Sequence, residues 1–228
     1  GSLNRIGAIN AGTGNVNLAL AGGTSGNGLV TANALNLTAV ANSSVNTTVN
    51  TVVANVSGSG NTLAIFQTGR DLNVASGAVR TNNGALTLDV SSPNNLTVTG
   101  NVSVGTAAVT LNAAGGAVNA PGLITAGTLN VAANSTSALN TAIGTLNANI
   151  TGSGSSLNVT QSGNLTVGVG NVRTNNGAIS ITTTNNGSLN RIGAINAGTG
   201  NVNLALAGGT SGNGLVTANA LNLTAVAN

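Results

Sequence analysis

The chain has 228 residues, enough to bury a substantial interior, yet only 3% of them are charged and the net charge is +3. It contains no Cys, His, Lys, Glu, Met, Trp or Tyr, and Phe66 is its one aromatic residue. These absences exclude disulfides, thiol catalysis, zinc knuckles and thioether-linked haem. Three excess charges spread over the whole chain do not make the clustered basic patch of a nucleic-acid-binding protein. No apolar run approaches the roughly 18 residues of a membrane-spanning helix, so we expect no membrane insertion in this segment.

Low charge and few aromatic residues also occur in disordered proteins. Here the mean hydropathy is +0.31, and Val, Leu and Ile alternate densely with Asn, Thr, Ser and Gly. Because such alternation is typical of β-strands with one buried face, we expect a folded, β-rich protein.

The opening segment, Gly1–Asn42, returns letter for letter at Gly187–Asn228. Repetition at a fixed period is typical of architectures in which one structural unit is stacked many times. We therefore interpret residues 1–186 as one complete unit and residues 187–228 as the start of the next.

That unit is itself a diverged tandem pair, with halves at 1–93 and 94–186. Four matches align the halves: Leu35–Leu37 with Leu129–Val131, Gly58–Gly60 with Gly152–Gly154, Gln67–Gly69 with Gln161–Gly163, and Val79–Ala85 with Val172–Ala178. The alignment slips by one position at Arg70–Leu72, where the second half has only Asn164 and Leu165. The halves are therefore two copies of one smaller design.

Short runs of alternating apolar and polar residues follow one another along each half, which predicts β-strands. Apolar side chains are expected to face inward in these runs, in chain order: Val16, Leu18 and Leu20; Leu86, Leu88 and Val90; Val109 and Leu111; Leu157 and Val159; Leu165 and Val167. Asn17, Ala19, Thr87 and Asp89 are expected to face outward. Clusters of Gly, Asn and Ser separate the runs and are predicted to form tight corners. No segment has helical periodicity with caps.

A sandwich or barrel also consists of many short strands, but neither fold extends by adding tandem copies. A solenoid does. We therefore predict an all-β fold, a parallel β-helix (β-solenoid) that is continuous over residues 1–228. Coils of roughly 20 to 25 residues would give about ten turns, each rising about 4.8 Å, in a rod about 50 Å long. Identical polar residues on successive coils are expected to form Asn ladders.

Three segments, Ile124–Val131, Gly163–Val167 and Thr174–Ile179, resemble the repeats of filamentous-haemagglutinin-like proteins. These proteins are giant bacterial adhesins and exported passengers of two-partner secretion systems. The resemblance covers nearly the whole chain. It implies a right-handed parallel β-helix, secretion across the outer membrane, and a fibre that projects from the cell or is released by it.

Two acidic residues, Asp71 and Asp89, are the only candidates for acid–base chemistry. Some parallel β-helices are polysaccharide lyases and hydrolases, and glycoside hydrolysis uses paired carboxylates. The two carboxylates could be neighbours on adjacent coils, but no aromatic platform or partner base accompanies them, so we expect a solvated surface pair and no enzyme. Calcium-binding β-rolls need acidic residues in their glycine-rich turns. Gly22–Gly28 contains none, and we predict no metal and no cofactor.

The most distinctive locus is Phe66 with Arg70 and Asp71. If Leu63 and Ile65 point inward, Phe66 points outward, whereas the matching half has Thr160. An exposed aromatic beside an ion pair, once in each unit, is a candidate lateral contact or receptor spot. The alternative interpretation is a surface residue at an irregular corner, because single exposed apolar residues are common.

These observations lead to three functional expectations. The first is a non-catalytic structural shaft of a long extracellular bacterial fibre or adhesin. The second is a self-assembling sheath or matrix filament of stacked solenoid subunits, and the distant third is a carbohydrate-active β-helix enzyme. The expected partners are copies of the chain itself, joined end to end or side by side, and the surface of a host or neighbouring cell.

Overall fold

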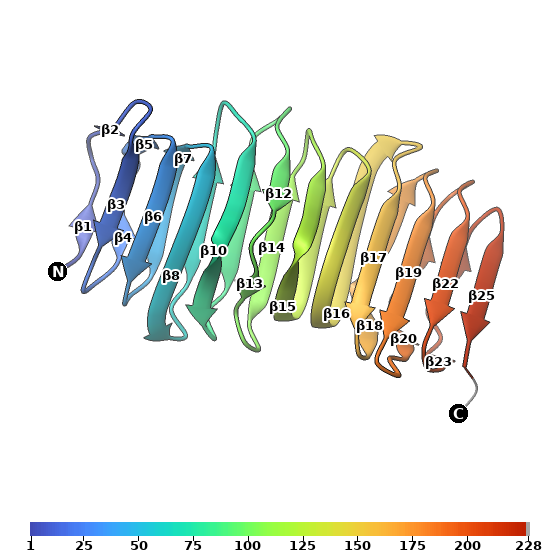
Figure 1. Ribbon diagram of the computed structural model, residues 1–228. Helices are drawn as coiled ribbons and strands as arrows, with labels where there is room; N and C mark the ends of the chain where they lie inside the picture. Colours follow the sequence, from blue (N-terminus) through green and yellow to red (C-terminus); the bar gives the residue numbers. More distant parts are fainter. Residues whose placement is uncertain (227–228) are drawn as a thin grey trace.

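The computed structural model describes residues 1–226 as a single β-solenoid of about 11 turns (Figure 1). This confirms the predicted all-β parallel solenoid. The described residues form 25 strands and no helix, and consequently no helix among them is suited to crossing a membrane.

Each coil contributes strands to two rows that stack along the rod. Row A contains β3 (Asn15–Ala19), β6 (Ala34–Ala39), β8 (Thr51–Ser59), β10 (Leu72–Asn82), β12 (Leu96–Val98) with β13 (Val102–Ser103), the first parts of β15 (Val118–Ala133) and β16 (Ser137–Ser153), β17 (Leu157–Ser162), β19 (Ile179–Thr184), β22 (Val202–Leu206) and β25 (Leu221–Ala225). Row B contains β1 (Leu3–Asn4) with β2 (Ile9–Asn10), β4 (Thr24–Ser25) with β5 (Leu29–Thr31), β7 (Ser43–Thr48), β9 (Leu63–Gln67), β11 (Leu86–Val90), β14 (Ala108–Ala113), the second parts of β15 and β16, β18 (Leu165–Asn175), β20 (Leu189–Arg191) with β21 (Ile195–Asn196), and β23 (Thr210–Ser211) with β24 (Val216–Thr217).

All strand pairs are parallel and join one coil to the next. In row A, for example, Val16 pairs with Leu35, and Leu35 pairs with Val52. Each coil therefore satisfies its backbone N–H and C=O groups on the coils before and after it, as buried backbone requires.

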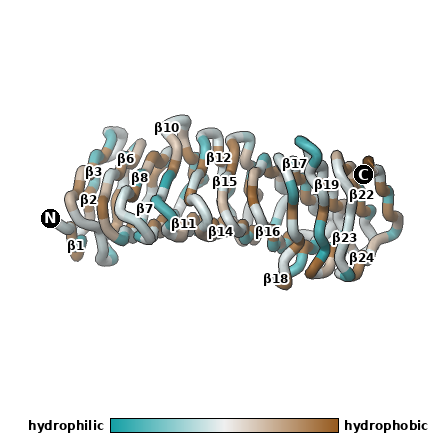
Figure 2. Tube along the Cα trace, turned by 90° about the horizontal axis from the view of Figure 1, so that it is seen from below, coloured by the Kyte–Doolittle hydropathy of each residue, from teal (hydrophilic) through white to brown (hydrophobic). Residues whose placement is uncertain are grey.

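The interior between the rows is filled by Val, Leu, Ile and Ala side chains. The predicted inward-facing residues of β11, β14, β17 and β18 are all buried, and so is Val16. Leu18 and Leu20 also face inward but are only partly buried, because they belong to the first coil. Figure 2 shows apolar and polar residues interspersed along the whole length of the rod.

Coil length varies more than predicted. The coil that runs from Leu123 to its register partner Asn140 is shorter than the expected range, whereas the coil that runs from Ala54 to Val79 lies at its upper limit. The predicted range is therefore wrong for the shorter coils, and the solenoid has about 11 turns rather than ten. The long coils carry inserted segments such as Ala75–Ala78, which leaves the ladder between Val74 and Val79.

The two halves of the repeat unit lie on opposite rows. From β6, which contains Leu35, row A climbs four steps through β8, β10 and β12 to β15. Leu129, the counterpart of Leu35, lies in the row B part of that same β15. One half therefore spans four and a half coils, and equivalent residues of the two halves face opposite sides of the rod.

The complete unit returns to the starting row. From β3, row A takes nine steps, through β6, β8, β10, β12, β15, β16, β17 and β19, to β22. β22 holds Val202, which is the copy of Val16. Two successive units therefore present the same residues on the same row after a whole number of coils.

Glycines at the corners are required by the close approach of neighbouring coils. A Cβ at Gly84 would overlap the carbonyl oxygen of Asn61, and a Cβ at Gly177 would overlap that of Ser155. Gly84 and Gly177 are equivalent in the two halves. The same steric limit therefore operates at both corners.

We expect Gly84→Ala to destabilise the solenoid by about 1–3 kcal/mol, because the added methyl group must push two coils apart. Gly7→Ala is the control, since a Cβ at Gly7 meets nothing within 4 Å, and it should change stability by less than about 0.5 kcal/mol. Urea unfolding followed by circular dichroism measures both. Equal midpoints for the two variants would contradict the steric explanation.

Candidate functional site

Phe66 lies on the outer surface of row B, in the middle of the predicted locus. Leu63 and Ile65 are buried beneath it, and the Phe66 side chain is 38% exposed. Its partners in register on the adjacent coils are Asn46 and Asp89. The predicted outward orientation is confirmed.

Arg70 and Asp71 do not form the expected ion pair. Arg70 Nη1 donates to Asn50 Oδ1 on the preceding coil (3.1 Å), whereas Asp71 Oδ1 accepts the backbone N–H of Asn95 on the following coil (2.7 Å). The prediction of an ion pair beside Phe66 is therefore wrong. Each charged side chain instead finds a polar partner one coil away, which is the direction in which the solenoid offers neighbours at close distance.

Arg70 ends an Asn ladder that runs along one corner. The amide of Asn33 donates to Asn15 (3.4 Å), and the amide of Asn50 donates to Asn33 (3.0 Å). A second ladder joins Asn36 to Asn17 on row A (2.7 Å). The predicted stacking of Asn side chains on successive coils is confirmed.

The two acidic residues are not stacked neighbours. Asp89 lies in β11, in register with Phe66 and Asn112, and accepts a hydrogen bond from the Asn112 amide (2.9 Å). The adjacent-coil partner of Asp71 is Asn95. The expectation that the carboxylates could be neighbours is therefore not met. Residues 1–226 also contain no group of three or more His, Cys, Asp or Glu that could hold a metal ion.

A buried glutamine fixes the corner that carries this locus. Gln67 is 1% exposed, and its amide donates to the carbonyl oxygens of Val49 (2.6 Å), Arg70 (3.3 Å) and Asp71 (3.4 Å). Its Oε1 accepts from the Thr47 hydroxyl (2.7 Å) and from the backbone N–H of Val49 (3.2 Å). One side chain thus ties the turn after β9 to the coil before it.

The second half repeats this arrangement on the opposite row. Gln161 accepts from the Thr141 hydroxyl (2.7 Å) and from the N–H of Ile143 (3.2 Å), and it donates to the carbonyls of Ile143 (2.9 Å), Ser162 and Asn164 (both 3.0 Å). The one-position slip between the halves falls within this corner. The glutamine accommodates it by bonding different turn carbonyls.

Arg5 is a buried cation that sequence patterning missed. It is 3% exposed, and it donates to the Thr24 hydroxyl (3.0 Å) and to the carbonyls of Gly26 (3.3 Å), Gly28 and Ser44 (2.6 Å). Burial lowers the pKa of the Arg5 guanidinium, which nonetheless stays charged because an arginine pKa is so high. Its hydrogen bonds join three successive coils.

Arg191, the copy of Arg5, is half-buried and repeats part of this arrangement. Arg191 donates to the carbonyls of Gly214 (2.8 Å) and Gly212 (3.3 Å), the counterparts of Gly28 and Gly26. Two of the contacts of Arg5 are therefore repeated where its local sequence recurs.

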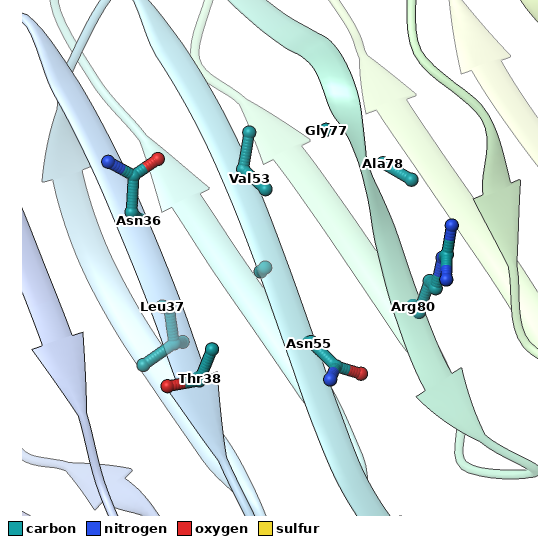
Figure 3. A pocket seen from close by; sticks show the side chains of 9 residues that line it. Asn36, Leu37, Thr38, Val53, Asn55, Gly77, Ala78 and Arg80 are labelled. Atoms are coloured by element: carbon teal, nitrogen blue, oxygen red, sulfur yellow. The ribbon is translucent and has the colours of Figure 1, made fainter.

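A shallow groove lies on the outer side of row A, across β6, β8 and β10 (Figure 3). We call it groove A; it has a volume of about 230 Å³. The residues that matter below are Asn36, Val53, Ala54, Asn55, Ala78 and Arg80. No carboxylate lines it, and the exposed Arg80 is its only charge.

The equivalent groove of the second half, groove B, lies on row B and is smaller, about 150 Å³. Asn147 replaces Val53 there, and Asn149 replaces Asn55. Arg173, the counterpart of Arg80, donates from Nε to Asn149 Oδ1 (2.9 Å). Arg173, unlike Arg80, is therefore held by a side chain of its own rod, and it does not line groove B.

Comparison of the chain with protein-family models, with curated proteins and with solved structures gives no match. The β-solenoid fold is therefore shown by the structure, and the family resemblance stays a prediction.

We expect Gln67→Leu to destabilise the solenoid by about 1–3 kcal/mol, because the N–H and C=O of buried Val49 lose their side-chain partner. Phe66→Ser is a matched control: it changes the neighbouring residue on the outer face and should leave the free energy of unfolding within about 0.5 kcal/mol of the wild-type value. If Gln67→Leu unfolded at the same urea concentration as the control, the glutamine would not be holding the corner.

Proposed function

We propose that this chain is a segment of the shaft of a long extracellular bacterial fibre of the filamentous-haemagglutinin-like kind, and that it serves by its length and stiffness rather than by catalysis. The observation that carries this proposal is the whole number of coils in one repeat unit. Because β22 takes the place of β3 after nine coils, units can be added in tandem with the same residues on the same row and without interrupting the ladder.

The chemistry of the surface supports a structural role. The outer faces are covered by short Asn, Thr and Ser side chains that bond along the rod, as in the Asn15, Asn33 and Asn50 ladder. The five arginines leave few sites for a trypsin-like protease, and continuous backbone pairing opposes the local opening that proteolysis needs. A receptor-binding tip, where one exists, would be carried by other parts of such a fibre.

A second candidate is a filament of separate stacked chains. Leu35 and Leu37 of β6 are buried where β8 pairs with β6. A coil of another copy, stacked in the same parallel register, could bury such side chains and pair such backbone groups as a coil of the same polypeptide does.

We expect images of the native material to show rods with a strong layer line near 4.8 Å and the denatured chain to have a very large mass on a gel. That pair of results supports the single-chain shaft. The same layer line from a chain of modest mass would favour the assembled filament. Compact particles without this layer line would contradict both candidates.

A further inference from the structure

Phe66 and Asp89 combine an aromatic ring and a carboxylate on the outer face of row B in the first half of the unit. They lie side by side in register on β9 and β11. Phe66 offers apolar surface, and Asp89 offers a carboxylate with one oxygen bound to Asn112. An aromatic residue next to a carboxylate is a pairing suited to a groove with an apolar floor and a cationic rim.

Groove A has those properties, and it lies on the opposite row. Half-buried Val53 gives it apolar surface, and Arg80 stands at one side, next to Asn55 in register (Figure 3). Arg80 makes no salt bridge or side-chain hydrogen bond within residues 1–226, so its charge has no partner in the described part of the chain.

The two features also occur at the same levels along the rod. β9, with Phe66, follows β8 in one coil, and β8 supplies the centre of groove A. β11, with Asp89, follows β10 in the next coil, and β10 supplies Arg80. A copy of the rod moved sideways without sliding therefore brings Phe66 to β8 and Asp89 to Arg80.

The residues of the two features also lie at similar distances from the corners that join the two rows. Arg80 lies before the corner at Gly84, and Asp89 lies after it, at nearly the same number of residues from the corner. In the same way, Asn55 lies before the corner at Asn61, and Phe66 lies after it, at nearly the same number of residues from the corner. Strands of the two rows run in opposite directions from these corners, so each pair sits at a similar height.

We propose that this chain binds a second copy of itself side by side, with Phe66 and Asp89 of one rod seated in groove A of the next. The contact joins two different surfaces and does not close on itself, so it builds flat rafts of parallel rods. A single contact of this size is weak. In a tandem array it recurs once in every repeat unit, and the repetition multiplies the attachment of one rod to another.

The second half of the unit supplies an internal control. The counterparts of Phe66 and Asp89 are Thr160 and Thr182, which lie in register on row A. They carry neither an aromatic ring nor a charge, and Arg173, the counterpart of Arg80, is already bonded to Asn149. The proposal therefore requires Arg80 and predicts no role for Arg173.

Two charge reversals test the contact in the full chain. Asp89→Arg places arginines on both surfaces, and Arg80→Asp places carboxylates on both, so each variant should remain as single rods. An equimolar mixture of the two variants should associate again, because each rod then meets the opposite charge. Arg173→Asp should associate as wild type does, and Phe66→Ser should associate less.

Sedimentation velocity at low ionic strength measures the association, and negative-stain images distinguish wider rafts from longer rods. The wild type should form rafts that dissolve as salt is added. Thermal unfolding by circular dichroism should be the same for every variant, since all the changes lie on the outer surface. Wild-type rods that remain single, reversal variants that form rafts as the wild type does, or a mixture that fails to associate would each overturn the proposal.

Discussion

The parallel backbone ladder between coils is the interaction on which the rest of this structure depends. Each strand bonds to strands about 4.8 Å before and after it, so every coil must rise by the same amount. A corner glycine such as Gly84 has no room for a Cβ because the preceding coil lies directly against it. The ladder also gives polar side chains a constant set of neighbours, which is why Asn and Arg residues find partners on adjacent coils.

The sequence was sufficient to predict the fold class, and the physical reason is the period of its residues. Leu86, Leu88 and Val90 alternate with polar residues, which in a strand places all three on one face, and that face is buried. The tandem copy of Gly1–Asn42 then favoured a solenoid over a closed fold. The length of a coil could not be predicted as well, since inserted segments such as Ala75–Ala78 leave the ladder without changing the pattern around them.

The candidate site was predicted only in part. Phe66 points outward because Leu63 and Ile65 on either side of Ala64 point inward. Gln67 is the next residue on the inward side after Leu63 and Ile65, so the alternation could have revealed its burial. In the same way, Arg5 is the next residue on the same side of the strand as Leu3, and this could have revealed the burial of Arg5. The directions of Arg70 and Asp71 could not be predicted, because adjacency along the chain suggested a pair that the stacked coils replace with closer partners.

The half-turn offset between the halves shapes the surface of the rod. Four and a half coils separate equivalent residues, so Arg80 lies on row A and Arg173 on row B. The polar supports at the corners are kept in both halves, as Gln67 and Gln161 show. The outward residues have diverged instead, with Phe66 in one half and Thr160 in the other. Duplication has thus preserved what holds the coils together and left the two faces of the rod different.

The most direct test of this account is the length of a longer rod. The chain should be extended by one further complete repeat unit in the same register, and its maximum dimension compared with that of the original by small-angle X-ray scattering and electron microscopy. Nine added coils predict a rod longer by about 43 Å with an unchanged width. A particle that grew in width, or a length increase far from that value, would contradict a unit made of nine stacked coils.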